Sequence, residues 1–339
     1  MNVKTPETAP KSTLDDQVLD HALRPKTFQE YIGQQQIKDN LRILLEAAKK
    51  RNEPVEHLLL HGPSGLGKTT LAYLIAHSLG TNLKITSGTA LEKAGDVGSI
   101  LSSLSDGDVL FIDEVHRLNR MVEEVIYPAM ENFKLDIIIG KGNMAKTLQI
   151  DLPHFTLIAA TTKISLLSAP FRSRFGANFR LEFYTPEDIE KIVLRSAEKL
   201  GVTIEPEALT VIAQSSRFTP RVANRLLKRA RDYAQVKGTS AVTADMAQGA
   251  MAMLAIDKSG LEETDRQILR VIADKFDGGP VGIKTIAAAL SEEEATIEDV
   301  YEPYLMRMGF LARTSKGRII TNSGLQHLGL KSKEKVFDF

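Results

Sequence analysis

The segment Gly62-Pro63-Ser64-Gly65-Leu66-Gly67-Lys68-Thr69 decides the fold of this chain. An apolar run, Leu58–Leu60, leads into it, and apolar residues at helical spacing follow over Leu71–Leu79. A strand, a loop of the pattern G-x-x-x-x-G-K-T and a helix indicate a phosphate-binding loop, because the loop turns its backbone N–H groups toward the phosphates and the helix N-terminus adds positive potential. Lys68 is expected to neutralise phosphate charge and Thr69 to coordinate Mg²⁺. An ordinary glycine-rich turn is the alternative, which the flanking strand and helix disfavour.

A second apolar run, Val109–Ile112, predicts a buried parallel strand that ends in Asp113-Glu114. Asp113 is expected to hold Mg²⁺ through water, and Glu114 to orient and deprotonate the attacking water. A surface acidic pair is the alternative. A carboxylate poised for water favours hydrolysis over transfer to an organic acceptor. Because the chain has no Asn-Lys-x-Asp motif for reading guanine, ATP is favoured over GTP.

A third apolar run, Phe155–Ala159, precedes Thr161-Thr162. Ligands of doubly wound sheets bind beyond the carboxyl ends of the strands, so a hydroxyl here would face the γ-phosphate; we prefer Thr161, with Thr162 second and a plain strand cap as the alternative. Arg172 and Arg174 follow, and such arginines suit a finger that stabilises transition-state charge. An arginine at the far end of its own sheet does not easily reach its own phosphate loop. A neighbouring subunit is the expected target, which predicts an oligomer; two solvated or ion-paired arginines are the alternative.

Together with Thr219-Pro220-Arg221, these motifs resemble the layout of AAA+ ATPases. More narrowly, the chain is similar to the RuvB family of bacterial Holliday junction branch-migration motors along nearly all of residues 20–330. The most specific matching segments are Thr219–Leu227, Gly278–Gly282 and Ile297–Leu305. The chain departs from the family pattern at Ser64, Lys163 and Phe171, none of which is expected to touch a phosphate or the metal.

The resemblance implies a set of nucleotide-binding residues and partners. The cofactors implied are ATP and Mg²⁺. The residues implied are Leu23 and Arg24, followed by Tyr31 and Ile32, around the adenine; Gly62, Gly65, Leu66, Gly67, Lys68, Thr69 and Thr70 in the loop; Glu131, Asn132 and Phe133; Arg174; Tyr184 at the hinge; and Arg221 as a second sensor of the γ-phosphate. The partners implied are Holliday junction or duplex DNA, further copies of the chain in a hexameric ring, the junction-binding protein RuvA and the resolvase RuvC.

Composition limits the class of protein. The chain has 339 residues, no Cys, and 43 basic against 43 acidic residues. The length predicts two or three domains, and the absence of Cys excludes disulfides and thiolate metal sites. No run of eighteen apolar residues and no signal-peptide pattern is present, so we expect a cytoplasmic protein without a membrane partner. Because the net charge is zero, DNA binding would need a local basic patch.

The chain is expected to fold as an α/β AAA+ sheet domain, a small helical lid and a C-terminal winged helix. Residues 1–20 are predicted to form a disordered lead-in, and 21–184 to alternate strands and helices. Residues 185–256 show no strand pattern, and Pro186, Pro206 and Pro220 suit the first position of successive helices. Residues 257–339 are predicted to form helix–helix–helix–hairpin, the winged-helix arrangement.

The wing is the predicted DNA contact. The third helix of the module carries Glu294, Glu298, Asp299 and Glu302, which would repel phosphates, whereas the hairpin carries Arg313, Lys316 and Arg318. We therefore expect these three cations to contact backbone phosphates without reading sequence. A winged helix that only docks proteins is the alternative. The basic third lid helix, with Arg225, Lys228, Arg229 and Arg231, is expected to be a solvated or ion-paired face.

A second hairpin is expected between the Asp113-Glu114 strand and the Thr161 strand. Two arms, Leu135–Ile139 and Thr147–Leu152, flank a turn rich in Gly and Asn. Its apolar side chains are Ile137, Ile138, Ile139, Met144, Leu148 and Ile150. Such a patch is typical of a partner surface, and the resemblance implies that RuvA docks there. Packing on its own domain is the alternative.

The predicted function is an ATP-driven DNA translocase that migrates Holliday junctions in recombination and DNA repair. One alternative is another AAA+ DNA machine, a clamp loader or a replication initiator. Clamp loaders carry Ser-Arg-Cys where this chain has Ser173-Arg174-Phe175. The other alternative is a non-motor switch, in which the bound nucleotide only gates partner binding.

Overall fold

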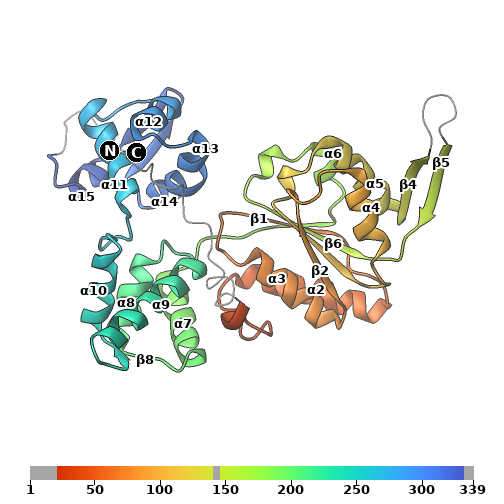
Figure 1. Ribbon diagram of the computed structural model, residues 1–339, viewed down its shortest axis with the longest axis horizontal. Coiled ribbons are helices and arrows are strands. Elements are labelled where there is room, and N and C mark those ends of the chain that lie inside the picture. Colours follow the sequence, from red (N-terminus) through yellow and green to blue (C-terminus); the bar gives the residue numbers. More distant parts are fainter. Residues whose placement is uncertain (1–20, 140–145, 332–339) are drawn as a thin grey trace, which may run out of the picture. The chain divides into compact units, whose positions relative to one another are not determined.

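The computed structural model describes residues 21–139 and 146–331. The chain divides into two compact units between Tyr184 and Thr185. Figure 1 shows the first unit built around a sheet and the second built almost entirely from helices.

A five-stranded parallel sheet forms the centre of the first unit, with strand order β2-β3-β6-β1-β7. The strands are β1 (Leu58–His61), β2 (Leu83–Ser87), β3 (Val109–Asp113), β6 (Thr156–Thr161) and β7 (Ala177–Arg180). The three central strands are those that the apolar runs predict, and β6 is buried along its whole length. The strands β2 and β7 lie at the edges and are only half-buried, so their sequences carry no continuous apolar run.

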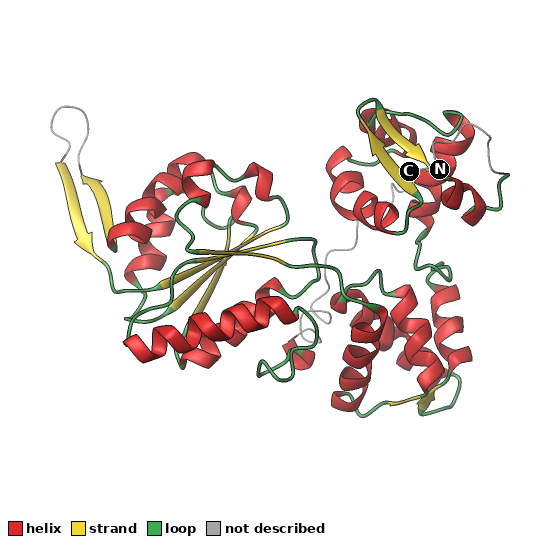
Figure 2. Ribbon diagram, turned by 180° about the vertical axis from the view of Figure 1, so that it is seen from behind, coloured by secondary structure: helices red, strands yellow, loops and turns green. Residues whose placement is uncertain are grey.

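Helices cover both faces of the sheet, as Figure 2 shows with the sheet seen along its edge. The helices of this unit are α2 (Gln35–Arg51), α3 (Lys68–Leu79), α4 (Ala94–Ser102), α5 (Arg120–Asn132) and α6 (Ala169–Arg172), with short 3-10 turns at η1 (Val115–Arg117) and η3 (Ile164–Leu166). A cluster of buried apolar side chains, among them Leu110, Ile112, Leu157 and Phe171, joins α4, α5 and α6 to the sheet. The doubly wound α/β fold predicted from the sequence is confirmed.

The predicted hairpin is present as β4 (Lys134–Ile139) and β5 (Lys146–Asp151). The two strands pair antiparallel, with Ile137 opposite Leu148. This two-stranded sheet is separate from the central one and extends away from it in Figure 1. It begins directly after α5 and returns the chain to β6.

The second unit begins with the lid, whose helices are α7 (Pro186–Lys199), α8 (Pro206–Ser215), α9 (Pro220–Val236) and α10 (Ala244–Met253). The predicted prolines lie at the first turn of α7, α8 and α9, where a missing N–H costs nothing. One feature differs from the prediction: two-residue strands β8 (Thr203–Ile204) and β9 (Ala241–Val242) pair in parallel. They tie together the turns ahead of α8 and α10, and two residues are too short to leave a sequence pattern.

The winged-helix module follows. Its elements are α11 (Glu263–Arg270), the π-helical turn η4 (Val271–Lys275), α12 (Ile283–Leu290), α13 (Glu294–Thr296), the π-helical turn η5 (Ile297–Tyr301), α14 (Glu302–Arg307), β10 (Leu311–Thr314), β11 (Gly317–Ile320) and α15 (Asn322–His327). The predicted third helix, Glu294–Met308, is therefore interrupted at η5. Pro303 at the start of α14 donates no N–H, which removes a helical bond at this point. The helices and the β10–β11 hairpin enclose one apolar core.

Candidate functional site

The phosphate-binding loop connects β1 to α3 and is shaped by positive backbone angles at its glycines. At Gly62, φ is 140°, and a Cβ atom there would lie 2.6 Å from the carbonyl oxygen of Leu181. At Gly67, φ is 99°, and a Cβ would lie 2.9 Å from the Tyr31 hydroxyl oxygen. Any side chain at either position would push the loop away from the segments that support it. The loop curvature thus follows directly from these residues.

The Lys68 side chain is buried at the start of α3. Its ammonium group donates to the carbonyl oxygens of Gly62 and Pro63, at 2.7 and 2.9 Å. The cation is therefore held against the backbone at the start of the loop. Thr69 and Thr70, in the same first turn, are half-buried.

Asp113 and Glu114 follow one another at the carboxyl end of β3, at the same edge of the sheet. Glu114 adopts a left-handed backbone conformation, with φ of 48°, which is rare for a residue with a side chain. Its N–H donates to Asp113 Oδ1 at 2.9 Å. Gly88, after β2, donates its N–H to the Asp113 carbonyl at 2.7 Å, and a Cβ there would lie 2.4 Å from the Glu114 carbonyl oxygen. The neighbouring strand thus fixes the turn that directs the two carboxylates.

The two threonines at the end of β6 have different surroundings. Thr161 is fully buried, accepts a hydrogen bond from the Lys163 N–H at 2.9 Å, and lies 2.9 Å from His116 Nδ1. Thr162 is half-buried, and its hydroxyl donates to Glu114 Oε2 at 3.3 Å. The Thr161 hydroxyl is therefore enclosed by protein groups, whereas the Thr162 hydroxyl is the one that reaches the Glu114 carboxylate.

His116 lies two residues after Glu114 and has no role in the sequence-based prediction. Its Nδ1 is 3.2 Å from Glu114 Oε2, and its side chain is almost fully buried. A single imidazole nitrogen thus lies within hydrogen-bonding distance of both Glu114 and Thr161. Histidine is common in sequences, so only its position beside the acidic pair could have drawn attention to it.

Two tyrosines converge on the backbone of the phosphate loop. The Tyr184 hydroxyl lies within hydrogen-bonding distance of the Leu66 carbonyl, at 3.2 Å, and of the Tyr31 hydroxyl, at 3.1 Å; the Tyr31 hydroxyl lies 3.5 Å from the same carbonyl. Burial raises the pKa of Tyr31 well above its ordinary value, so this hydroxyl stays protonated. Tyr184, the last residue of the first unit, is therefore anchored to the backbone of the loop. Of the residues predicted to lie around the adenine, Leu23 is buried, and the Arg24 guanidinium carbon lies 3.8 Å from the Tyr73 ring centroid.

Arg174 follows α6 and is ion-paired to α5. Its guanidinium is 3.0 Å from Glu131 Oε1 and 4.3 Å from the Tyr127 ring centroid. Tyr127 in turn donates to the buried carboxylate of Glu123 at 2.7 Å, and Ser168 donates to the same oxygen at 2.9 Å. Ser168 caps the helix that precedes Arg174, so one hydrogen-bond network holds both the segment that carries Arg174 and the Tyr127 ring that its guanidinium contacts. Tyr127 and Glu123 left no motif in the sequence.

The remaining residues that were predicted to bind the nucleotide differ in their exposure. Asn132 is exposed, as is Arg172 on α6, whereas Phe133 packs against the core of the sheet domain. Arg221 is exposed at the start of α9 in the second unit.

The three predicted DNA-contacting cations are not equivalent. Arg313 is exposed and lies 3.2 Å from Glu298, and Lys316 is exposed at the tip of the hairpin. Arg318, in contrast, is 7% exposed and donates through Nε and Nη2 to the carboxylate of Glu302, which is 3% exposed. Arg318 is therefore a buried, ion-paired cation, and its position does not favour contact with a DNA phosphate. The sequence alone presents the acidic helix as solvated, whereas in the structure that helix supplies the partner of Arg318.

The predicted partner patch on the β4–β5 hairpin is described only in part. Leu148 is 49% exposed, and Ile150 packs against the sheet-domain core. Met144 lies outside the described residues, and for Ile137, Ile138 and Ile139 the backbone alone is described.

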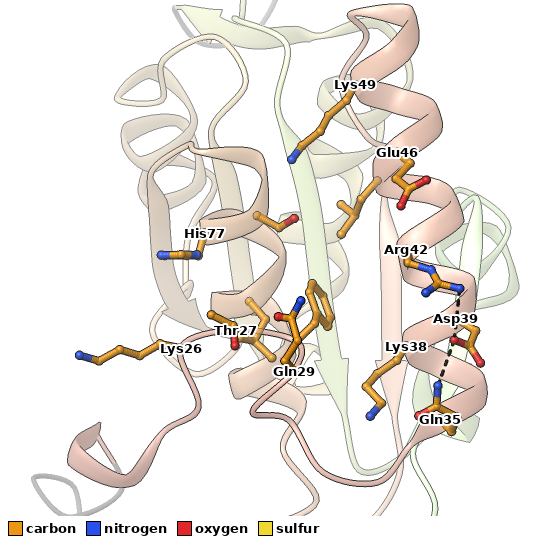
Figure 3. A pocket seen from close by; sticks show the side chains of 14 residues that line it. Lys26, Thr27, Gln29, Gln35, Lys38, Asp39, Arg42, Glu46, Lys49 and His77 are labelled. Carbon is orange, nitrogen blue, oxygen red and sulfur yellow. Dashed lines mark hydrogen bonds and ion pairs between the residues drawn. The ribbon is translucent and has the colours of Figure 1, made fainter. Parts of the chain in front are cut away.

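A cavity of about 490 Å³ is lined by side chains of α2, of α3 and of the segment 26–29 (Figure 3). Its lining is strongly charged, and includes Lys26, Lys38, Asp39, Arg42, Glu46 and His77. None of the lining residues belongs to the loop Gly62–Thr69 or to the acidic pair. This cavity is therefore separate from the nucleotide edge of the sheet.

Metal clusters and membrane spans are both absent from the part of the chain that the structure describes. Over residues 21–139 and 146–331, no group of three or more His, Asp or Glu side chains is arranged to hold a metal ion. None of the helices in those two ranges is both long and apolar enough to cross a membrane.

The parallel sheet, its phosphate loop and the acidic pair at the same edge, followed by a helical lid, define a P-loop ATPase of the AAA+ class. Three family models divide the chain in order: the Holliday junction DNA helicase RuvB P-loop domain over residues 23–181, the RuvB AAA lid domain over 184–257 and the RuvB C-terminal winged helix domain over 258–329. The chain belongs to the RuvB family.

Two relatives illustrate the similarity. The Holliday junction branch migration complex subunit RuvB of Dehalococcoides mccartyi (strain CBDB1) is 56% identical over 320 residues, which are 94% of this chain and 92% of that one. The solved structure of the Thermotoga maritima RuvB Holliday junction branch migration motor is 48% identical, with a TM-score of 0.85, and the match covers 92% of this chain and all of that one. The predicted AAA+, lid and winged-helix fold is confirmed.

Proposed function

We propose that this chain hydrolyses ATP with Mg²⁺ and uses the energy to move DNA through a Holliday junction, as one subunit of a branch-migration ring. The observation that carries the proposal is the meeting of the phosphate loop and the Asp113-Glu114 pair at one edge of a parallel sheet. The lid and winged-helix models of the same family match residues 184–257 and 258–329.

The residues at this edge fit a magnesium ion. Mg²⁺ prefers oxygen ligands and usually takes only one or two from the protein, with the rest from water and phosphate. Thr69 offers a hydroxyl at the start of α3, and Asp113 a carboxylate at the end of β3. When bound, the ion would neutralise charge on the phosphates during phosphoryl transfer.

Glu114 is the residue that we assign to the attacking water. Its Oε2 accepts from the Thr162 hydroxyl and lies within hydrogen-bonding distance of His116 Nδ1, so the carboxylate is oriented from two directions. A general base held in this way contributes roughly 10² to 10⁴ in rate. We assign to Thr162, in place of Thr161, the role of connecting the γ-phosphate side of the site to this base.

We assign the finger to Arg174, acting on the nucleotide of a neighbouring subunit in a hexameric ring. Its guanidinium lies beside Glu131 on α5, and both residues lie outside the phosphate loop of their own chain. Glu131 and Asn132 would face the same neighbouring nucleotide. A finger of this kind is worth roughly 10³ to 10⁵ in rate in related nucleotide hydrolases.

The lid and winged helix supply the coupling to DNA. Arg221, exposed at the start of α9, is assigned to the γ-phosphate, so that phosphate loss releases the lid. Lys316 and Arg313 on the wing are assigned to DNA phosphates. The partner proteins would be a RuvA-type junction-binding protein, docked on the β4–β5 hairpin through Leu148, and a RuvC-type resolvase. The cytoplasm is the expected compartment.

A synthetic four-way junction tests the proposal. With ATP, Mg²⁺ and a RuvA-type partner, the chain should convert the junction to duplex products, and it should not do so with a non-hydrolysable ATP analogue. An ATP-gated switch would bind the junction in an ATP-dependent manner but leave its strands unexchanged. Binding without conversion would therefore overturn the motor assignment in favour of the switch.

A further inference from the structure

The loop between α8 and α9 of the lid inserts into the core of the winged-helix module. Phe218 packs against that core, with its ring centroid 6.0 Å from that of Tyr304. The guanidinium carbon of Arg307 lies 4.8 Å from the Phe218 ring centroid. The lid and the winged helix are thus joined by buried side chains as well as by the chain itself.

Arg217 is the most tightly held residue of this loop. Its Nη1 donates to Asp265 Oδ2 at 3.0 Å and its Nη2 to Asp265 Oδ1 at 3.3 Å, a paired arrangement that lysine does not provide. Nη2 also donates to the Val300 carbonyl at 3.0 Å, and the guanidinium carbon lies 4.6 Å from the Tyr304 ring centroid. The Asp265 side chain is 0% exposed and that of Arg217 10%. Burial raises the pKa of Asp265 to about 6.

The backbone at this point is in a conformation that side chains disfavour. Arg217 and Phe218 have φ of 54° and 55°, so two consecutive residues are left-handed. Each costs about 1 to 2 kcal/mol, which only strong surrounding contacts sustain. Arg217 and Phe218 supply those contacts from within the winged-helix core. Without these contacts, we expect the turn to relax to a more common backbone conformation.

The same turn sets the start of α9. Thr219 donates its hydroxyl to the Ser216 carbonyl at 3.2 Å, and Pro220 is in the first turn of the helix. Arg221 follows at once, only four residues from Arg217. The direction in which α9 leaves the turn, and with it the position of Arg221, therefore depends on the residues that anchor the turn.

We infer that Arg217 is a positioning residue for Arg221: its ion pair inside the winged-helix module holds the start of α9, and so connects the DNA-binding module to the nucleotide contact of the lid. The inference rests on the proposed role of Arg221. In this assignment Arg217 contacts neither nucleotide nor DNA. A purely structural tether would make the same contacts but would not act through Arg221, and this difference can be measured.

The test is a double-mutant cycle in the full-length chain. The first variant, Arg217→Met with Asp265→Leu, replaces the buried pair by apolar side chains of similar size and leaves no unpaired charge. Steady-state ATP hydrolysis is measured for this variant, for Arg221→Ala, and for the two combined. We expect turnover to fall about tenfold in the first variant, and to fall no further when it is added to Arg221→Ala, because both changes disable the same residue.

Arg225→Ala is the matched control. It removes another ion pair between α9 and the winged-helix module, Arg225–Glu262 at 3.4 Å, which is half-exposed and not attached to the strained turn. Its turnover should remain within about twofold of the wild type, as expected for an exposed ion pair. Thermal unfolding checks that each variant is folded. If the apolar pair does not fold, Arg217→Lys serves instead, since it keeps the charge and loses the paired geometry; the same non-additivity with Arg221→Ala is expected.

The outcomes separate the inference from the proposed function. Full turnover in the folded Arg217 variant, or losses that multiply with those of Arg221→Ala, would overturn the positioning role. Full turnover in Arg221→Ala alone would instead show that the proposed second sensor is misassigned, and the Arg217 inference would fall with it. Non-additive loss together with an unaffected Arg225→Ala supports both.

Discussion

Charged residues cluster both at the carboxyl edge of the parallel sheet and at the wing of the winged helix, but the two clusters differ in how far they are exposed. At the sheet edge, Asp113 and Glu114 follow the last buried residue of β3 and remain partly exposed. At the wing, Arg318 and Glu302 are buried against each other, at 7% and 3% exposure. The carboxylates at the sheet edge thus stay accessible, as the proposed chemistry requires, whereas Arg318 in the hairpin is enclosed in the fold.

The difference has a geometric origin. A residue that follows a parallel strand lies at the open edge of the sheet, where ligands bind. In an antiparallel hairpin, directly opposed residues share one face, and Arg313 is opposite Arg318. That face is turned toward the acidic third helix, since both arginines lie within 3.5 Å of Glu298. The two wing arginines are thus ion-paired with the acidic helix, whereas Lys316 is exposed at the tip of the hairpin.

The largest expected effect lies at the sheet domain and concerns Arg174. Arg174→Ala should bind ATP but lose turnover by roughly 10³-fold or more, because a finger acts on transition-state charge. Mixing it with Lys68→Ala subunits should restore part of the hydrolysis, since some sites then combine an intact phosphate loop with an intact neighbouring finger. Hydrolysis is measured across mixing ratios. Absence of recovery at every ratio would place the function of Arg174 within its own subunit.

A smaller effect is expected at the wing, on stability. Arg318→Ala leaves the buried Glu302 carboxylate without its partner and should cost about 3 to 5 kcal/mol, which is typical of a broken buried ion pair. The unfolding transition of the winged-helix module, followed by calorimetry, should shift to lower temperature. Lys316→Ala at the exposed tip is the control and should stay within about 0.5 kcal/mol of the wild type. Equal stability of the two variants would contradict the view that Arg318 stabilises the fold whereas Lys316 does not.

The smallest effect is expected for DNA binding. Replacing Arg313 and Lys316 together by Ala should weaken binding to duplexes of any sequence by a similar factor. The slope of log affinity against log salt should flatten by roughly one unit for each DNA phosphate that the wing no longer neutralises. Fluorescence anisotropy at several salt concentrations measures both. Unchanged affinity and slope would move the DNA surface to the basic face of α9, around Lys228 and Arg229.

Much of the fold could be predicted from the sequence, because the apolar runs of β1, β3 and β6 are buried on both faces of the sheet. The edge strands β2 and β7 could not, since half-burial leaves no continuous apolar run. At the site, motif spacing located Lys68 and Asp113. The choice between Thr161 and Thr162 depends on which hydroxyl points out of the sheet, and no pattern of residues gives that.

The same limit applies to side chains whose role is set by tertiary contacts. His116 beside Glu114, Tyr127 beneath Arg174 and Arg217 inside the winged-helix core carry no motif of their own. The burial of Arg318 could not be predicted, because a one-dimensional charge pattern does not show that Glu302 lies beside it. The local sequence predicts which polar residues lie at the end of a strand. It does not predict which side chains pair with a charged residue, because the fold brings those partners together.

The most direct test of the account is the rate of four-way junction conversion by Glu114→Gln compared with the wild type, with ATP and a RuvA-type partner at equal DNA occupancy. Loss of the general base should lower ATP turnover by roughly 10² to 10⁴ while ATP binding persists. We predict that junction conversion falls by the same factor, because movement is driven by hydrolysis at the sheet edge. Conversion at the wild-type rate by Glu114→Gln would contradict the account.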